Sequence, residues 1–235
     1  MEPLDPLPAR MAGVVRRPRA ILTALKAVPG WADVLVVTFL VTAALSAALL
    51  ETDVGQLALL DQWERTAIAF GQDVSEEQYE AMQAASDNGA AYAVASSLAT
   101  GPAMAFGLAA LLLAGFRLTG ARGVTYQQVL SVVAHAGVIL LLRQVIAAPI
   151  VYARETLASP VTLNLFFTVI DEASPPARFL AAVDLFVVWW IIVIAMGMSA
   201  LYGRPARRLA IIFVGLYALL AAVVTAAMAL TGGTA

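Results

Sequence analysis

The sequence contains no cysteine and a single histidine, His135. The lack of cysteine excludes disulfides, thiolate metal sites and a cysteine nucleophile. One histidine is too few for the usual zinc and metalloprotease spacings, and the chain carries neither a phosphate-binding glycine loop nor a GxSxG motif. The residues therefore predict a protein that is not an enzyme and that uses no metal or cofactor.

Charge is scarce as well. Charged residues make up 13% of the 235 residues, about half the usual share of a soluble domain, and hydrophobic residues make up 61%. The mean hydropathy is +0.85. Apolar runs of roughly 17–25 residues recur, each long enough for a helix to cross a bilayer. The sequence predicts an all-α, polytopic membrane protein that contacts the lipid bilayer. Its basic residues follow the ends of these runs, which gives no support to nucleic-acid binding.

We expect one transmembrane domain over residues 31–235, preceded by a cytoplasmic tail and an amphipathic juxtamembrane helix in residues 1–30. The expected spans cover residues 34–50, 92–116, 129–152, 179–202 and 209–230. Residues 51–90 form an acidic loop outside the cytoplasm. Within it, Ser75 and Gln78 fit a capping box that starts a helix at about Glu76.

The N-terminal segment is expected to begin as a flexible tail over residues 1–17, with a helix from Pro18. Apolar residues of this helix, such as Leu22 and Leu25, share one face, and Arg19 and Lys26 lie elsewhere. This pattern suits a helix on the membrane surface against anionic lipid. A solvated juxtamembrane helix is the alternative.

The topology follows from basic residues near the span ends. Ten of them lie before the first span and in the second and fourth connections, against three on the other side. The count predicts a cytoplasmic N-terminus and an external C-terminus. Thirteen arginines against one lysine, with abundant alanine, hint at a GC-rich bacterial genome and hence at a bacterial inner membrane.

Polar residues inside the spans are the candidate functional residues. Arg143 in the third span and Asp184 in the fourth differ in expected depth by ~5 Å, a distance that an arginine side chain can cover. We predict that they pair, which would offset the cost of burying either charge. The alternative is a proton relay that includes His135. Gln144 is a further polar residue of the third span.

Small and hydroxyl side chains form stripes on three spans, and such stripes favour close contact between helices. The predicted helix-packing residues are Thr38, Thr42, Ser46, Ser97, Gly101, Ala218, Ala222 and Ala226. Pro102 is expected to kink the second span.

These features favour a non-enzymatic scaffold, membrane-organising protein or accessory subunit that contacts other membrane proteins or itself. The alternative is a small transporter or channel that uses Arg143 and Asp184.

Four stretches resemble a known family. RRPR at Arg16–Arg19 precedes a short helix and the first span, and GARGVTYQQVLSVVAHA at Gly120–Ala136 has a glycine-containing turn followed by an aromatic residue and a glutamine. DLFVVWW at Asp184–Trp190 and a basic turn before the last apolar span, Arg204–Leu230, complete the pattern. Residues 12–230 thus resemble a bacterial member of the Yip1 domain family.

The resemblance implies five spans with a cytosolic N-terminus, in agreement with the charge count. Eukaryotic members of that family are trafficking factors that bind small GTPases through a cytosolic N-terminal region. Because that region is only about 30 residues long in this sequence, the GTPase role is not carried over. Two features depart from the family pattern: the proline expected early in the third span comes only at Pro149, and the acidic loop is long.

Overall fold

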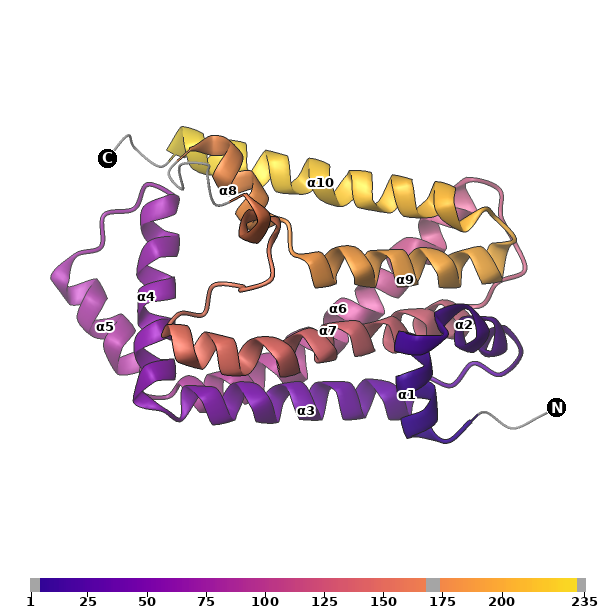
Figure 1. The fold of residues 1–235 in the computed structure, drawn as a ribbon, viewed down its shortest axis with the longest axis horizontal. Coiled ribbons are helices and arrows are strands. Elements are labelled where there is room, and N and C mark those ends of the chain that lie inside the picture. The colour runs from indigo at the N-terminus through magenta and orange to yellow at the C-terminus, as the bar shows by residue number, and fades with distance from the viewer. Residues whose placement is uncertain (1–4, 168–173, 232–235) are drawn as a thin grey trace. The chain divides into compact units, whose positions relative to one another are not determined.

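The chain folds into helices throughout the part that the structure describes. The computed structural model describes residues 5–167 and 174–231. In those ranges it contains α1 (Leu7–Arg16), α2 (Pro18–Ala27), α3 (Ala32–Leu50), α4 (Asp53–Ala69), α5 (Glu76–Ser86), α6 (Gly89–Leu118), α7 (Tyr126–Arg154), the short 3-10 helix η1 (Leu163–Phe166), α8 (Pro175–Ala182), α9 (Leu185–Tyr202) and α10 (Ala206–Thr231) (Figure 1). The predicted all-α class is confirmed.

Five of these helices are long and apolar enough to cross a membrane. They are α3, α6, α7, α9 and the stretch Ala206–Leu230 of α10, with 19, 30, 29, 18 and 25 residues. A helix rises 1.5 Å per residue, so even the shortest extends about 27 Å, close to the thickness of the hydrocarbon core. The five predicted spans are therefore present, and the protein is a multi-pass membrane protein.

Contacts divide the chain into two compact units. The first unit comprises residues 1–42, 96–143 and 186–215, and the second comprises residues 43–95, 144–185 and 216–235. Helices α3, α6, α7 and α10 supply residues to both units, and α9 lies in the first unit except for Leu185.

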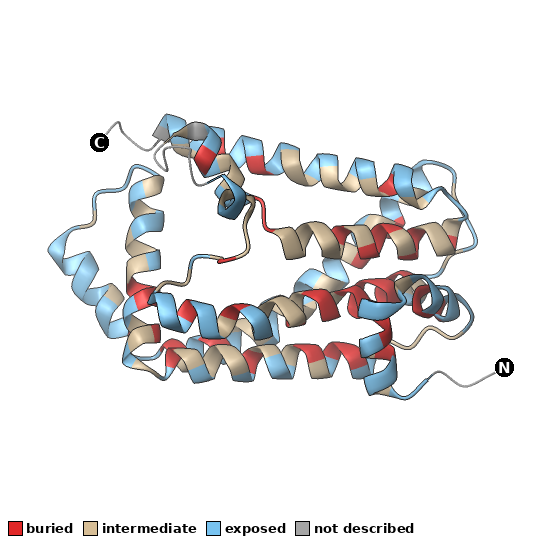
Figure 2. Cartoon of the chain, viewed as in Figure 1, coloured by how far each residue is buried: buried red, intermediate tan, exposed pale blue. Residues whose placement is uncertain are grey.

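The core of the first unit is built around the first half of α7. Its residues from Val129 to Ile139 are buried with the exception of half-buried Gly137 (Figure 2). A helix that is apolar and buried on all sides takes the centre of its fold. Buried side chains of α1, α2, α3, α6 and α9 join α7 in one continuous cluster.

The prediction of a flexible tail over residues 1–17 is wrong for residues 7–16, which form a helix. Residues from Leu7 form α1, and Val14 on α1 is fully buried together with Leu22 and Leu25 on α2. Burying one leucine side chain contributes about 2 kcal/mol, enough in sum to hold both helices on the core. The apolar face of α2 therefore contacts protein, whereas the sequence analysis places this face against the membrane surface or leaves it beside solvent.

The fourth span also begins later than predicted. The sequence predicts one helix over residues 179–202, but α8 ends at Ala182 and α9 begins at Leu185. The cause is a backbone bridge in which residues 183–185 run antiparallel to residues 161–163. The carbonyl oxygen of Val183 and the N–H of Leu185 bond to residues 163 and 161, so the helix is interrupted at residues 183 and 184.

The acidic loop contains the predicted helix. Ser75 Oγ accepts a hydrogen bond from the N–H of Gln78 at 3.3 Å, and Gln78 Oε1 accepts one from the N–H of Ser75 at 3.1 Å. This reciprocal pair is the predicted capping box of α5. The loop also contains α4, which the sequence analysis does not predict; Thr52 caps its first turn.

Candidate functional site

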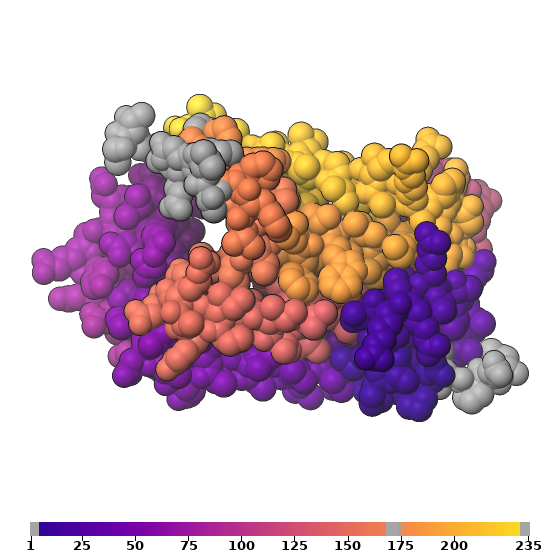
Figure 3. All heavy atoms as spheres, viewed as in Figure 1, coloured from indigo at the N-terminus to yellow at the C-terminus, as the bar shows by residue number. Residues whose placement is uncertain are grey.

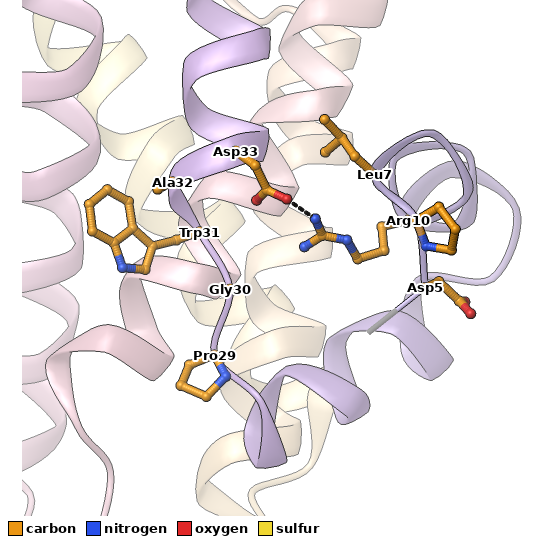
Figure 4. Close-up of a pocket in the computed structure, with 9 residues that line it drawn as sticks. Asp5, Leu7, Arg10, Pro29, Gly30, Trp31, Ala32 and Asp33 are labelled. Carbon is orange, nitrogen blue, oxygen red and sulfur yellow. Dashed lines mark hydrogen bonds and ion pairs between the residues drawn. The ribbon is translucent and has the colours of Figure 1, made fainter. Parts of the chain in front are cut away.

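A buried arginine joins α1 to α3. Arg10 keeps only 4% of its surface exposed. Its guanidinium forms a hydrogen-bonded ion pair with Oδ2 of Asp33, in the first turn of α3 (Figure 4). The other oxygen of Asp33 accepts a hydrogen bond from the N–H of Val34 at 2.9 Å. Burial of the Arg10 charge requires such a partner, because a lone guanidinium would lose its hydration without compensation.

The lone histidine completes this cluster. His135 is fully buried on α7, and its Nδ1 lies 2.8 Å from the carbonyl oxygen of Ser131. Since a carbonyl oxygen can only accept, Nδ1 carries the proton and donates it. Nε2 lies 3.4 Å from Nη1 of Arg10, and a guanidinium can only donate. His135 is therefore the neutral Nδ1–H tautomer, with both ring nitrogens in hydrogen bonds.

The cluster formed by Arg10, Asp33 and His135 connects three helices that are far apart in sequence. Its charges balance, and the ring nitrogens of His135 and the carboxylate of Asp33 have hydrogen-bond partners in the cluster or in the adjacent backbone. Across the described residues, no group of three His, Cys, Asp or Glu side chains is placed to hold a metal ion. The cluster can fix the positions of its three helices, and its side chains are not arranged for nucleophilic chemistry.

A shallow pocket of 630 Å³ opens beside the cluster. Its lining comes from Asp5, Pro6, Leu7, Arg10, Pro29, Gly30, Trp31, Ala32 and Asp33. Figure 4 shows Trp31 on the opposite side of the chain from Arg10, and its indole packs edge-on against Phe106 at a centroid distance of 5.7 Å. Oδ2 of Asp5 lies 3.8 Å from Nη2 of Arg17, and Asp33 forms an ion pair with Arg10. Both carboxylates that line the pocket therefore already have a cationic partner.

A second set of polar contacts, made by Gln128 and Tyr126, holds the start of α7. Oε1 of Gln128 accepts hydrogen bonds from the backbone N–H and the hydroxyl of Thr125, at 2.9 and 3.2 Å. Its Nε2 donates to the carbonyl oxygen of Lys26, at the end of α2, at 2.7 Å. The hydroxyl of Tyr126 donates to the carbonyl oxygen of Phe106 on α6 at 3.0 Å. The aromatic and glutamine of the Gly120–Ala136 stretch thus join α7 to α2 and α6.

Asp184 lies in the break between α8 and α9 and is 6% exposed. Its Oδ2 accepts a hydrogen bond from the hydroxyl of Ser159 at 2.6 Å. Its backbone N–H donates to the hydroxyl of Tyr217 at 3.2 Å, and that hydroxyl donates to the carbonyl oxygen of Ala182 at 3.0 Å. The carboxylate therefore ties together the segment before η1 and the start of α9, within the second unit.

The remaining predicted polar residues have mixed outcomes. Gln144 donates a hydrogen bond from Nε2 to the hydroxyl of Ser46 at 3.2 Å. Arg143 belongs to the first unit and Asp184 to the second, and their pairing stays a prediction. The ring nitrogens of His135 are bonded to Arg10 and Ser131, and neither of those residues belongs to the predicted relay.

The predicted packing residues divide by helix. Thr38 is buried and Thr42 is half-buried on α3, and the ring of Phe39 lies so close to Gly101 that a Cβ there would overlap it. Ser97 is half-buried. On α10, Ala218 is half-buried, but Ala222 and Ala226 lie on the exposed face. The buried face of α10 instead carries Ala221 and Thr225. Packing through Ala222 and Ala226 stays a prediction. Helix α6 continues through Pro102.

Sequence reasoning missed the Arg10 cluster. In the sequence alone, Arg10 is only one of several basic residues before the first span. The available signal was Asp33, an acidic residue at the start of an apolar run that otherwise follows basic residues. An acid at that point can pair with a base or accept a hydrogen bond from a free N–H of the first turn, and in the structure Asp33 does both.

Comparison with known proteins identifies a family for the chain. Comparisons with curated proteins and with solved structures each gave no match. The profile of the Yip1 domain family matches residues 12–228, and this range contains nearly all of the five apolar helices. Members of this family are in general non-enzymatic membrane proteins involved in trafficking. The chain therefore belongs to the Yip1 domain family.

Proposed function

We propose that the protein is a scaffold or accessory subunit that organises other proteins in its membrane. The observation that supports this most directly is that polar side chains inside the apolar helices form hydrogen bonds within the chain. Ser131, His135 and Thr225 bond to backbone or side-chain groups of their own chain, and Gln144 bonds to Ser46. A permeation path needs polar groups that face water. Ser131 and Thr225 instead bond to carbonyl oxygens of their own helices, and His135 and Gln144 bond to side chains of other helices.

The outward faces of the apolar helices supply the surface that a scaffold needs. Helix α10 exposes large apolar side chains along its length, with Ile211, Leu216 and Leu219 each more than half exposed. Only 17% of its most apolar stretch is buried within the chain. In a bilayer such a face contacts lipid or the helices of a partner protein.

Site-specific photocrosslinking on α10 tests the proposed role. A photoreactive side chain at Leu219, which is 61% exposed, should give a crosslinked product of discrete mass in native membranes. The same side chain at Leu165, also exposed but outside the five apolar helices, is the control and should not give that product. Lipid adducts alone at Leu219 would contradict a scaffold that works through this face.

We further propose that the membrane is a bacterial inner membrane, with the N-terminus in the cytoplasm and the C-terminus outside. The distribution of basic residues supports this orientation. A single cysteine in place of Ala84, exposed on α5, should react in intact cells with a thiol reagent that cannot cross membranes. A cysteine in place of Ala24, exposed on α2, should react only after the cells are opened. The reverse result would invert the topology.

A further inference from the structure

Basic residues converge at one end of the first unit. Three segments, residues 16–26, 117–122 and 204–208, together contain nine basic residues and no acidic one, and all nine are exposed. We call these three segments the basic end. They belong respectively to α1 and α2, to the end of α6 with the turn that follows, and to the turn between α9 and α10 with the first turn of α10.

Contacts within the first unit hold the three segments together. The hydrogen bond from Gln128 to the carbonyl oxygen of Lys26 fixes the end of α2 at the start of α7. The rings of Phe116 and Tyr202 stack at a centroid distance of 4.1 Å and join the end of α6 to the end of α9. Figure 1 shows α2 and both turns at the same end of this unit, and Figure 3 shows the surface that α1 and α2 present there.

The cations of the basic end are mostly without acidic partners. Among the residues that the structure describes, Arg17 is the one cation of the nine with a carboxylate within ion-pair distance, that of Asp5 at 3.8 Å. The fold thus concentrates like charges that repel one another, and an anion from outside the chain would relieve that repulsion.

The positions of several cations strengthen this inference. Arg207 and Arg208 lie in the first turn of α10, and Arg19 lies in the first turn of α2; neither turn contains an acidic residue. The N-terminal end of a helix carries partial positive charge, so a cation there is unfavourable unless an anion lies near it. The sequence therefore places cations where the chain itself provides no compensation.

The depth of the basic end selects the kind of anion. Arg117 lies in the last turn of the membrane-spanning helix α6, and residues 203–205 alone separate α9 from α10. Basic residues so close to the ends of spans lie at the level of lipid headgroups. The apolar face of α2 is buried in the core, which leaves Arg19 and Lys26 exposed on this helix.

We propose that the basic end binds the phosphate groups of anionic phospholipids, so that the protein selects anionic lipid from its membrane. This binding is independent of the scaffold role, because it requires only that the protein spans a membrane. The contacts are charge-assisted hydrogen bonds from guanidinium groups to phosphate oxygens.

Lipid retention by purified protein tests the proposal. The full chain is purified in a nonionic detergent with equal amounts of phosphatidylglycerol and phosphatidylcholine of the same acyl chains, and native mass spectrometry counts the lipids retained. The wild type should retain phosphatidylglycerol in excess. The variant R204Q/R207Q/R208Q should lower that excess roughly fivefold or more, since each basic residue near an anionic surface contributes to attraction.

A matched control removes the same charge elsewhere. The variant R65Q/R154Q/R178Q also replaces three exposed arginines, all in the second unit, and should retain lipid as the wild type does. Equal losses in both variants would overturn the proposal, because net charge alone would then explain retention. Raising the salt concentration should lower the preference of the wild type itself, a measurement that needs no variant.

Two further results would also overturn the proposal. One is equal retention of the two lipids by the wild type. The other is a lack of lipid preference together with binding of a polyglutamate peptide, which would make the basic end a surface for acidic protein segments.

Discussion

Arg10 shows how the contacts of one residue can hold an N-terminal segment on the folded core. Arg10 is buried, and its guanidinium contacts Asp33 and His135, while Val14 on the same helix belongs to the core. The two members of the ion pair differ in surroundings, because the side chain of Arg10 is 5% exposed and that of Asp33 is 48% exposed. This difference predicts unequal costs for removing either charge.

We expect Asp33→Asn to destabilise the protein more than Arg10→Met does. The first change leaves a buried guanidinium without its counter-charge, at a cost of about 3 kcal/mol. The second leaves a half-exposed carboxylate that water can solvate and removes the 3.4 Å hydrogen bond to Nε2 of His135, while a methionine fills much of the same volume. We expect about 1–2 kcal/mol. Unfolding by denaturing detergent, followed by tryptophan fluorescence, measures both. Equal costs, or the reverse order, would contradict the burial of the Arg10 charge.

At the scale of elements, Gln128 connects helices in two ways, as a cap for α7 and as a donor to the end of α2. Replacing it with alanine should lower stability by about 1–2 kcal/mol, since two kinds of hydrogen bond are lost. It should also speed hydrogen exchange at the backbone amides of α2.

The neighbouring residue offers a control for this prediction. Gln127 is exposed on α7, and Gln127→Ala should leave both stability and exchange in α2 unchanged within about 0.5 kcal/mol. If Gln128→Ala behaves in the same way as Gln127→Ala, the side chain does not hold α2 on α7.

Helices α7 and α9 approach closely at Gly197. A Cβ at this position would overlap the side chain of Val132 on α7, and Val132 is itself fully buried and cannot move away freely. Gly197→Ala should therefore cost about 1–3 kcal/mol through overpacking. At Gly215, in α10, a Cβ would meet no atom within 4 Å.

Gly215→Ala should accordingly be neutral, or stabilising by up to about 1 kcal/mol because alanine favours helix. Thermal unfolding of both variants in the same detergent compares them directly. Similar melting temperatures for the two would show that α9 does not pack on α7 through Gly197.

For the molecule as a whole, the sequence predicts what depends on local pattern. Five apolar runs identify five helices, and Ser75 with Gln78 identifies the start of α5, because both signals lie within a few residues. The break at Asp184, in contrast, has no local signal. Residues 179–202 are almost continuously apolar, and the bridge that breaks the helix comes from residues 161–163.

The Arg10 cluster is harder still to predict. Arg10 and His135 are separated by 125 positions, and no local pattern relates them. Basic residues before a first span have a ready explanation in topology, so the buried one cannot be told from the exposed ones. Burial of Arg10 follows from the docking of α1 and α2 on the core, and this is a property of the whole first unit.

The central claim is that polar side chains within the apolar helices bond to groups of their own chain and do not line a water-filled path. Ser131 tests it most directly, because it is fully buried one helical turn from His135. The chain contains no cysteine, so S131C introduces one thiol with little change in size. The exposed position of A84C provides the reference rate, and both thiols should react fully once the protein is unfolded.

In folded protein we predict that a small water-soluble thiol reagent modifies S131C at least about a hundredfold more slowly than A84C, since access requires local opening of the helices. A rate at S131C similar to that at A84C would contradict the account and would favour a transporter or channel.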